Sequence, residues 1–284
     1  MPQPLPKIRL HVPRQDAARP WAAGDALALG RDQAHYLVSV MRLTAGGTVC
    51  VFNGQDGEWL ARLAEAGKRA ATLALAERLA PAVLPPDVWL IFAPLKKART
   101  DYVVEKAAEL GCRRIVPCLT RLTNAERVNV ARLQAHAIEA AEQCGLTHVP
   151  EVATPVRLEA LLAAWPTGRR LMVCDERAAG FNAPRPVARA PAAAALAAQP
   201  RGAPWAVLCG PEGGFDDAEI ARLAAMEAAL AVGLGPRVLR ADTAAVAALA
   251  LWQATLGDWG GEDAERRRAD AHPRGPEAHR GGGG

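Results

Sequence analysis

Two short loops carry the side chains with which this sequence can do chemistry. The first loop follows the apolar run that ends at Cys209 and reads GPEGGF over residues 210–215. Its glycines let backbone amides approach a ligand closely, and Glu212 is a carboxylate among them. Asp216 and Glu219 have the spacing of a capping box, which predicts a helix that begins directly after the loop. Because ligands favour the carboxyl ends of strands in parallel sheets, this loop is a candidate binding site.

The second loop repeats the arrangement. A short apolar strand over residues 231–234 runs into Gly235-Pro236, and Arg237 and Arg240 follow within one turn of loop. A guanidinium next to an apolar helix needs an anionic or carbonyl partner, so Arg240 is a candidate functional residue. We expect the two loops to end neighbouring strands and to form facing walls of one pocket.

A long apolar helix is expected over residues 243–257, directly after the second loop. Asp242 and Thr243 both suit N-cap positions, which is a purely structural explanation for them. Trp252 on this helix suits either a subunit interface or the core.

Many other functional motifs are absent from the sequence. There is no P-loop, no Gly-x-Gly-x-x-Gly after a strand, no Gly-x-Ser-x-Gly turn and no Cys/His spacing for zinc. His136 and Glu139 lie three apart on an expected helix, where a solvated face is the better interpretation, so no metal is expected. Neither a signal-peptide run nor an apolar stretch of membrane-spanning length is found, so no membrane partner is expected. The six cysteines form no C-x-x-C pair, which is typical of reduced thiols and predicts a cytoplasmic protein.

The chain changes character at the Pro-rich segment 81–87. Before it, short alternating segments predict a small β-barrel with one helix over residues 31–43; the expected strands are 7–12, 25–29, 47–54, 58–65 and 70–79. After it, strands and helices alternate, which predicts a largely parallel sheet with helices on both faces. The expected strands are 88–94, 113–119, 169–176 and 204–210, and the expected helices are 100–111 and 131–145. Residues 178–204 are expected to be an exposed loop, and 260–284 a disordered tail.

The two loops together resemble the cofactor loops of the SPOUT methyltransferases, the α/β-knot class. The segments RLHV, HYLVSVMRLTAGGTVCVFNG, LKKARTDYVVEKAAELG and AEQCG narrow the resemblance to the family of ribosomal RNA small subunit methyltransferase E, over about residues 8–258. The resemblance implies an α/β protein with a trefoil-knotted SPOUT methyltransferase domain over residues 85–259, through which the family forms homodimers. It also implies an N-terminal PUA-like, RNA-binding β-barrel over residues 1–84.

The resemblance further implies S-adenosylmethionine as cofactor and N3 of a uridine in 16S rRNA of the small ribosomal subunit as substrate. The RNA-binding candidates are Arg9 and Arg42. The family has Glu where this chain has Asp242, a change that keeps the charge but shortens its reach. The positions implied around the cofactor are Leu208, Gly210, Pro211, Glu212, Gly213, Gly214, Leu234, Gly235, Val238, Leu239 and Thr243.

The chemistry of uracil suggests roles for the charged residues. N3 becomes a nucleophile only when its proton leaves and negative charge spreads onto O2 and O4, so the enzyme needs a proton acceptor or a stabilising cation. We expect Arg240 to be the principal catalytic residue and Glu212 to accept the proton if it is buried. Asp242 can instead hold Arg240 in place.

Three other functions stay open from the residues alone. A SPOUT enzyme that methylates tRNA would have the same two loops. A non-catalytic RNA-binding assembly factor would keep the fold without turnover, and a pocket for a small-molecule substrate is the third alternative.

Overall fold

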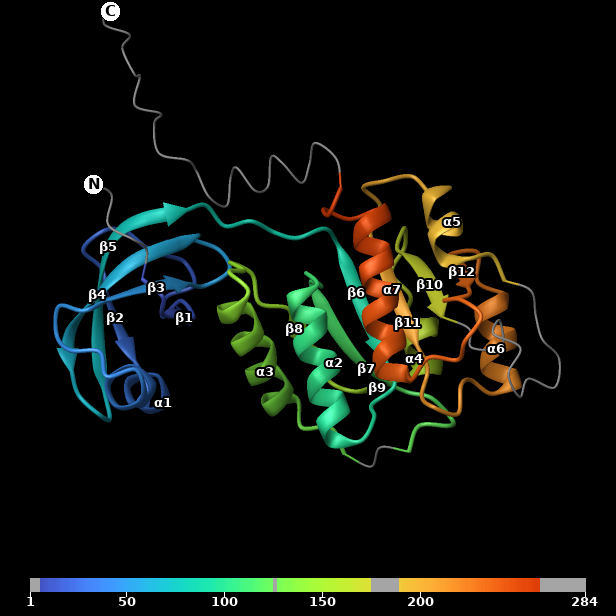
Figure 1. Ribbon diagram of the computed structural model, residues 1–284, viewed down its shortest axis with the longest axis horizontal. Helices are drawn as coiled ribbons and strands as arrows, with labels where there is room; N and C mark the ends of the chain where they lie inside the picture. Colours follow the sequence, from blue (N-terminus) through green and yellow to red (C-terminus); the bar gives the residue numbers. More distant parts are fainter. Residues whose placement is uncertain (1–5, 125–126, 175–188, 261–284) are drawn as a thin grey trace, which may run out of the picture. The chain divides into compact units, whose positions relative to one another are not determined.

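The computed structural model of the protein describes residues 6–124, 127–174 and 189–260 (Figure 1). These residues divide into two units, one that ends at Val83 and one that spans Leu84–Gly260. Most of the predicted tail lies outside the described residues, as does the first part of the predicted loop 178–204. In the described part of the chain, no helix is long and apolar enough to cross a membrane.

The first unit is built on a five-stranded sheet with the strand order β1-β3-β4-β5-β2. β1 pairs with β3 in parallel, and the other pairs are antiparallel. Alternate side chains of these strands point to one face and form a core with Leu37 of the helical segment. The predicted strands are therefore confirmed, whereas closure into a barrel stays a prediction. The strands are β1 (Arg9–His11), β2 (Ala26–Leu29), β3 (Thr48–Phe52), β4 (Glu58–Ala66) and β5 (Ala71–Ala80).

The single helix predicted over residues 31–43 is shorter and changes its winding. α1 spans Arg31–His35 and continues as a π-helical turn over Tyr36–Val40. The segment ends at Arg42, whose φ of 55° is the one positive value among the described non-glycine residues. A non-glycine residue in this region is sterically disfavoured, so the conformation of Arg42 is held by its surroundings.

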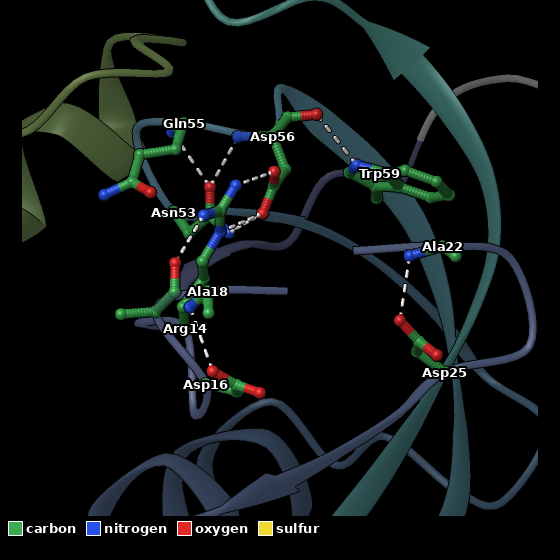
Figure 2. Close-up of polar contacts among 10 residues, drawn as sticks. Arg14, Asp16, Ala18, Ala22, Asp25, Asn53, Gln55, Asp56 and Trp59 are labelled. Atoms are coloured by element: carbon green, nitrogen blue, oxygen red, sulfur yellow. Dashed lines mark hydrogen bonds and ion pairs between the residues drawn. The ribbon is translucent and has the colours of Figure 1, made fainter. Parts of the chain in front are cut away.

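A buried carboxylate fixes two loops of the first unit to each other (Figure 2). Arg14 donates hydrogen bonds from Nε and Nη2 to the Asp56 carboxylate, with an Nε–Oδ2 distance of 2.7 Å. Asn53 donates to the same carboxylate at 2.6 Å, and Trp59 Nε1 donates to the Asp56 carbonyl at 3.0 Å. The Arg14 hydrogen bond is the main reason that the pKa of Asp56 lies below its usual value. These hydrogen bonds join residues of the cluster to one another, which indicates that Arg14 and Asp56 stabilise the fold.

The second unit contains a parallel seven-stranded sheet with the order β12-β10-β11-β6-β7-β8, and β9 pairs with β7 beside this path. The predicted α/β class is therefore confirmed. Its strands are β6 (Val88–Phe92), β7 (Arg114–Leu119), β8 (Glu151–Val152), β9 (Val156–Arg157), β10 (Arg170–Cys174), β11 (Trp205–Cys209) and β12 (Ala229–Val232). Its helices are α2 (Lys97–Glu109), α3 (Val130–Gln143), α4 (Leu158–Ala163), α5 (Ala192–Ala197), α6 (Asp217–Ala224) and α7 (Ala241–Thr255).

Helices cover both faces of this sheet, as predicted (Figure 1). Trp205, Val207 and Cys209 of β11 belong to a core shared with α2, α3, α5 and α7. The alternate residues Ala206 and Leu208 belong to a second core with α4 and α6. Alternation along a fully buried strand thus supplies two cores at once.

Two local predictions for the second unit are wrong, and the structure decides between the two interpretations of Trp252. Residues 178–204 are not all loop, because α5 forms within them. The N-cap of α7 is Arg240, so Asp242 and Thr243 lie in its first turn rather than at the cap. An acidic residue is also favoured in the first turn, next to the positive end of the helix dipole, and this competes with the N-cap preference. Trp252 is only 1% exposed within this single chain and belongs to the core.

Candidate functional site

A cavity of about 260 Å³ lies at the carboxyl ends of β10 and β11, and both predicted loops line it. The two loops do not end neighbouring strands, because β10 lies between β11 and β12. That correction adds Cys174, the last residue of β10, to the cavity wall. The described lining residues are Cys174, Cys209, Gly210, Pro211, Glu212, Gly214, Phe215, Ile220, Leu234, Gly235, Arg237, Val238, Leu239, Arg240, Ala241 and Ala244.

The loop after β11 is shaped by its glycines and by the helix that follows. A Cβ atom at Gly210 would lie 3.1 Å from the Phe215 ring, so a side chain there would press on the cavity wall. The N–H of Gly214 donates to the carbonyl of Pro211 at 2.9 Å and closes a tight turn. Asp216 and Glu219 form the predicted capping box, with Asp216 Oδ1 accepting from Glu219 N at 2.7 Å. The fixed start of α6 therefore holds the loop at the cavity.

The loop after β12 turns at Gly235, whose φ is 115°. Few residues other than glycine adopt this conformation, and it lets the chain turn back toward the cavity before α7 begins. Leu234 and Leu239 give this wall an apolar surface, and Arg237 and Arg240 add two cations.

The two carboxylates near the cavity mouth face one guanidinium that the sequence analysis did not single out. Nη1 of Arg99, in the first turn of α2, donates to Glu212 Oε1 at 2.8 Å. Its Nε lies 3.6 Å from Asp242 Oδ2. Asp242 thus pairs with Arg99, and the expectation that it can hold Arg240 is not met. Arg99 stands in the segment after β6, the direct neighbour of β11, but only the strand order reveals this proximity.

The guanidinium groups of Arg237 and Arg240 are accessible to a ligand. Both are exposed, and no hydrogen bond or ion pair connects either side chain to the described residues. Because Arg99 pairs with Glu212 and Asp242, no carboxylate of the described residues forms an ion pair with Arg237 or Arg240.

Two neighbouring thiols form part of the cavity floor. Cys174 and Cys209 are register partners in the parallel pair of β10 and β11. Hydrogen bonding to Cys209, together with burial, raises the pKa of Cys174 well above its usual value. Since the thiolate is the nucleophilic form of cysteine, Cys174 is a poor nucleophile in this cavity.

Most residues expected around the cofactor are brought together in this cavity, and three are placed elsewhere. Leu208 points into the opposite core, because it alternates with Cys209 along β11. A Cβ atom at Gly213 would face the side chain of Leu122 at 3.5 Å. Thr243 is exposed in the first turn of α7. The residues expected around the cofactor that do line the cavity are Gly210, Pro211, Glu212, Gly214, Leu234, Gly235, Val238 and Leu239. The expected catalytic residue Arg240 lines it as well.

The two expected RNA contacts lie in the first unit and differ in character. Arg9 is largely buried, with its Nε 2.6 Å from Glu58 Oε1 and its guanidinium 4.8 Å from the Phe52 ring centroid. Arg42 is exposed beside the exposed side chains of Val40 and Met41. Within the described residues, no group of three or more His, Cys, Asp or Glu side chains is placed to hold a metal ion.

Comparison with known families assigns both units. Residues 83–253 match a family model described as an RNA methyltransferase domain. Residues 29–75 match a model described as an RNA methyltransferase PUA domain. The fold and the two models thus define an RNA methyltransferase of the SPOUT superfamily with a PUA-like domain.

Curated relatives narrow the assignment from RNA methyltransferases in general to one family that acts on ribosomal RNA. Ribosomal RNA small subunit methyltransferase E of a Synechocystis strain is 33% identical over 228 residues, which are 79% of this chain and 71% of the relative. The protein of the same name from Rickettsia conorii is 28% identical over 216 residues, 76% of this chain and 84% of the relative. The chain belongs to the family of ribosomal RNA small subunit methyltransferase E.

Two similar solved structures extend over nearly the whole described fold. A Legionella pneumophila protein described as a methyltransferase, in complex with S-adenosylmethionine, has a TM-score of 0.75 and 28% identity, covering 89% of this chain and 100% of that one. Ribosomal RNA small subunit methyltransferase E of Neisseria gonorrhoeae, bound to S-adenosylmethionine, has a TM-score of 0.73 and 25% identity, covering 89% and 99%.

Proposed function

We propose that the protein transfers a methyl group from S-adenosylmethionine to N3 of a uridine in 16S rRNA of the small ribosomal subunit. The family and its named relatives support methylation of small-subunit rRNA with this cofactor. The observation that carries the choice of N3 is the exposed guanidinium of Arg240 at the mouth of the cavity between the two loops, which pairs with no carboxylate of the described residues.

The residues of the cavity fit the proposed cofactor. Its walls combine apolar side chains, such as Phe215 and Leu239, with the exposed backbone of two glycine-containing turns. Such turns can bind an adenine through amides and carbonyls, and the apolar side chains can cover its faces. When bound, S-adenosylmethionine supplies an electrophilic methyl group on a sulfonium.

Arg240 acts on the other reactant, the uracil. Loss of the N3 proton places negative charge on O2 and O4, and a guanidinium at the cavity mouth stabilises that anion. The N3 lone pair then forms the new N–CH3 bond as the S–CH3 bond breaks, and a neutral thioether leaves. This displacement needs alignment of the two reactants rather than a covalent enzyme intermediate. Cys174 is kept protonated and does not compete for the methyl group.

Glu212 is proposed as the group that accepts the N3 proton. Its carboxylate lines the cavity and is oriented by the 2.8 Å hydrogen bond from Arg99. The deep burial expected for an acceptor is not observed, because half of the side chain is exposed. The condition for Glu212 as acceptor is therefore not met in the free protein, and Glu212 is proposed as acceptor only in the complex, where bound RNA covers its carboxylate.

The N-terminal unit is proposed to hold the RNA. Arg42 suits a phosphate contact, because its guanidinium projects from an exposed, conformationally fixed helix end. Arg9 is proposed as a second contact, although its ion pair with Glu58 makes a structural contribution equally important. Binding through phosphates predicts an RNA affinity that falls with salt concentration.

The remaining proposals concern assembly and topology. The domains are proposed as residues 1–84 and 85–259, with a trefoil knot in the second domain and a cytoplasmic location. A homodimer is proposed through α7, where Val246, Ala247 and Ala250 are only half-buried in the single chain. Light scattering of the purified protein is expected to give twice the chain mass.

The test of the catalytic assignment compares two arginines of the same loop. Arg240→Ala is expected to lower the rate of methyl transfer to small subunits by a factor of about 100, while the affinity for S-adenosylmethionine stays within about twofold. Arg237→Ala is the matched control, because it removes the same exposed charge three residues away, and its rate is expected to fall less than tenfold. Near-normal turnover by Arg240→Ala would remove this residue from the mechanism.

A further inference from the structure

Arg99 is placed where a cation is locally unfavourable. It lies in the first turn of α2, which begins with Lys96 as N-cap and Lys97 as first residue. The amino end of a helix is the positive end of its dipole, so basic residues there destabilise the helix slightly. A guanidinium in this position therefore calls for compensation from carboxylates outside α2.

The compensation comes from both walls of the cavity. Glu212 belongs to the loop after β11, and Asp242 belongs to the first turn of α7, which follows the loop after β12. The two ion pairs differ in length, with 2.8 Å from Arg99 Nη1 to Glu212 and 3.6 Å from its Nε to Asp242. The side chain of Arg99 thus connects the loop after β11, through Glu212, to the start of α7, through Asp242.

The backbone that carries Arg99 is well fixed. Oγ1 of Thr100 accepts a hydrogen bond from Leu95 N and donates one to Leu95 O, both at 2.9 Å. Thr100 and Leu95 are buried. Arg99 therefore extends from a well-fixed segment of backbone, and its guanidinium can hold the carboxylates of Glu212 and Asp242 in place.

We infer that Arg99 is a positioning residue that clamps the two walls of the cofactor cavity through Glu212 and Asp242. The clamp also engages Asp242, the carboxylate closest to Arg240 in the sequence, so that Asp242 pairs with Arg99 instead of Arg240. The inference rests on the proposed function of the cavity as the S-adenosylmethionine site.

In the proposed clamp, Asp242 is the second partner of Arg99, and its short side chain explains why this ion pair is the longer of the two. Asp242 reaches Arg99 only at 3.6 Å, a distance longer than a hydrogen bond. Asp242→Glu adds one methylene toward Arg99 and is expected to bring the carboxylate into hydrogen-bonding range. The cofactor affinity of Asp242→Glu is accordingly expected to equal or exceed that of the wild type.

The test is a double-mutant cycle on the full chain, with S-adenosylhomocysteine as the titrated ligand in a calorimeter. Arg99→Met keeps much of the side-chain length and removes the charge; it is expected to weaken binding about fivefold, since the pairs are partly exposed. Glu212→Gln alone is expected to weaken binding similarly. In the double variant the two losses should not multiply in full, because both substitutions remove the Arg99–Glu212 ion pair. Arg222→Met, which removes the exposed pair with Glu159 at 2.6 Å in the same unit, is the matched control and should bind as the wild type does.

Two further measurements distinguish a role of Arg99 in positioning the cofactor loops from a merely structural role. The KM for S-adenosylmethionine should rise in Arg99→Met while the KM for the RNA substrate stays constant. Arg99→Lys should recover part of the affinity, and it provides the same measurement if the Met variant does not fold.

The binding measurements distinguish failure of the clamp from failure of the proposed cofactor site. If the wild type takes up no S-adenosylhomocysteine, the cofactor assignment itself fails. If the wild type binds but Arg99→Met and Arg99→Lys bind equally well, the clamp is refuted. Fully multiplicative losses in the cycle would also refute it, because they would mean that Arg99 and Glu212 act independently.

Discussion

Gly235→Ala isolates the contribution of one backbone conformation to cofactor binding. Gly235 has a φ of 115°, and a Cβ atom built on it would meet no atom within 4 Å. The substitution therefore adds strain of about 1–2 kcal/mol from the backbone alone, without a steric collision. Because the position is exposed and unpacked, the free loop can relax to escape this strain. Ligand binding then has to restore the strained turn, so the dissociation constant should rise by about 5- to 30-fold.

Gly24→Ala is the matched control for this measurement. Gly24 has a φ of 89° and equally open surroundings, but it belongs to the first unit. Calorimetric titration with S-adenosylmethionine should give wild-type affinity for Gly24→Ala and weaker binding for Gly235→Ala. Thermal unfolding followed by circular dichroism checks that both variants fold. Equal affinity of Gly235→Ala and the wild type would show that the turn at Gly235 does not shape the site.

Three further predictions concern stability. Trp252→Ala removes a core side chain that is 1% exposed, and it should lower the unfolding free energy by about 3–5 kcal/mol in urea titrations; a loss below about 1 kcal/mol would contradict its core placement. Asp56 has a lowered pKa in the folded protein, chiefly through Arg14, so its stabilising effect is complete above the unfolded pKa and disappears as pH falls through the folded value. The stability gap between the wild type and Asp56→Asn should therefore shrink as urea titrations move from pH 7 to acid, and a constant gap would refute this. Asp216→Ala removes the cap of α6 and should cost about 0.5–2 kcal/mol, whereas Asp216→Asn keeps an acceptor and should cost less.

Local patterns in the sequence predict much of the second unit correctly. The buried strand that ends at Cys209 and the capping box from Asp216 to Glu219 are both observed, because each depends on residues close together in the chain. The same locality explains an error at α7, where Asp242 was expected as a cap. Two local preferences of aspartate compete there, and the sequence alone does not decide between the N-cap and the first turn.

Features that depend on strand order were not predictable. The placement of β10 between β11 and β12 comes from packing between distant segments, and it brings Cys174 into the cavity. Arg99 lies 113 residues from Glu212 in the chain, and only the pairing of β6 with β11 brings their loops together. Periodicity and motif spacing contain no information about such contacts.

The most direct test of the account is the identity of the methylated nucleoside. Small ribosomal subunits from cells that lack the gene are incubated with purified protein and S-adenosylmethionine, and the 16S rRNA is digested for mass spectrometry. The account predicts one new nucleoside, 3-methyluridine, whose initial rate of formation falls about 100-fold when Arg240→Ala replaces the wild type. A methyl group on a ribose or on guanine, or an unchanged nucleoside profile with folded wild-type protein, would contradict it.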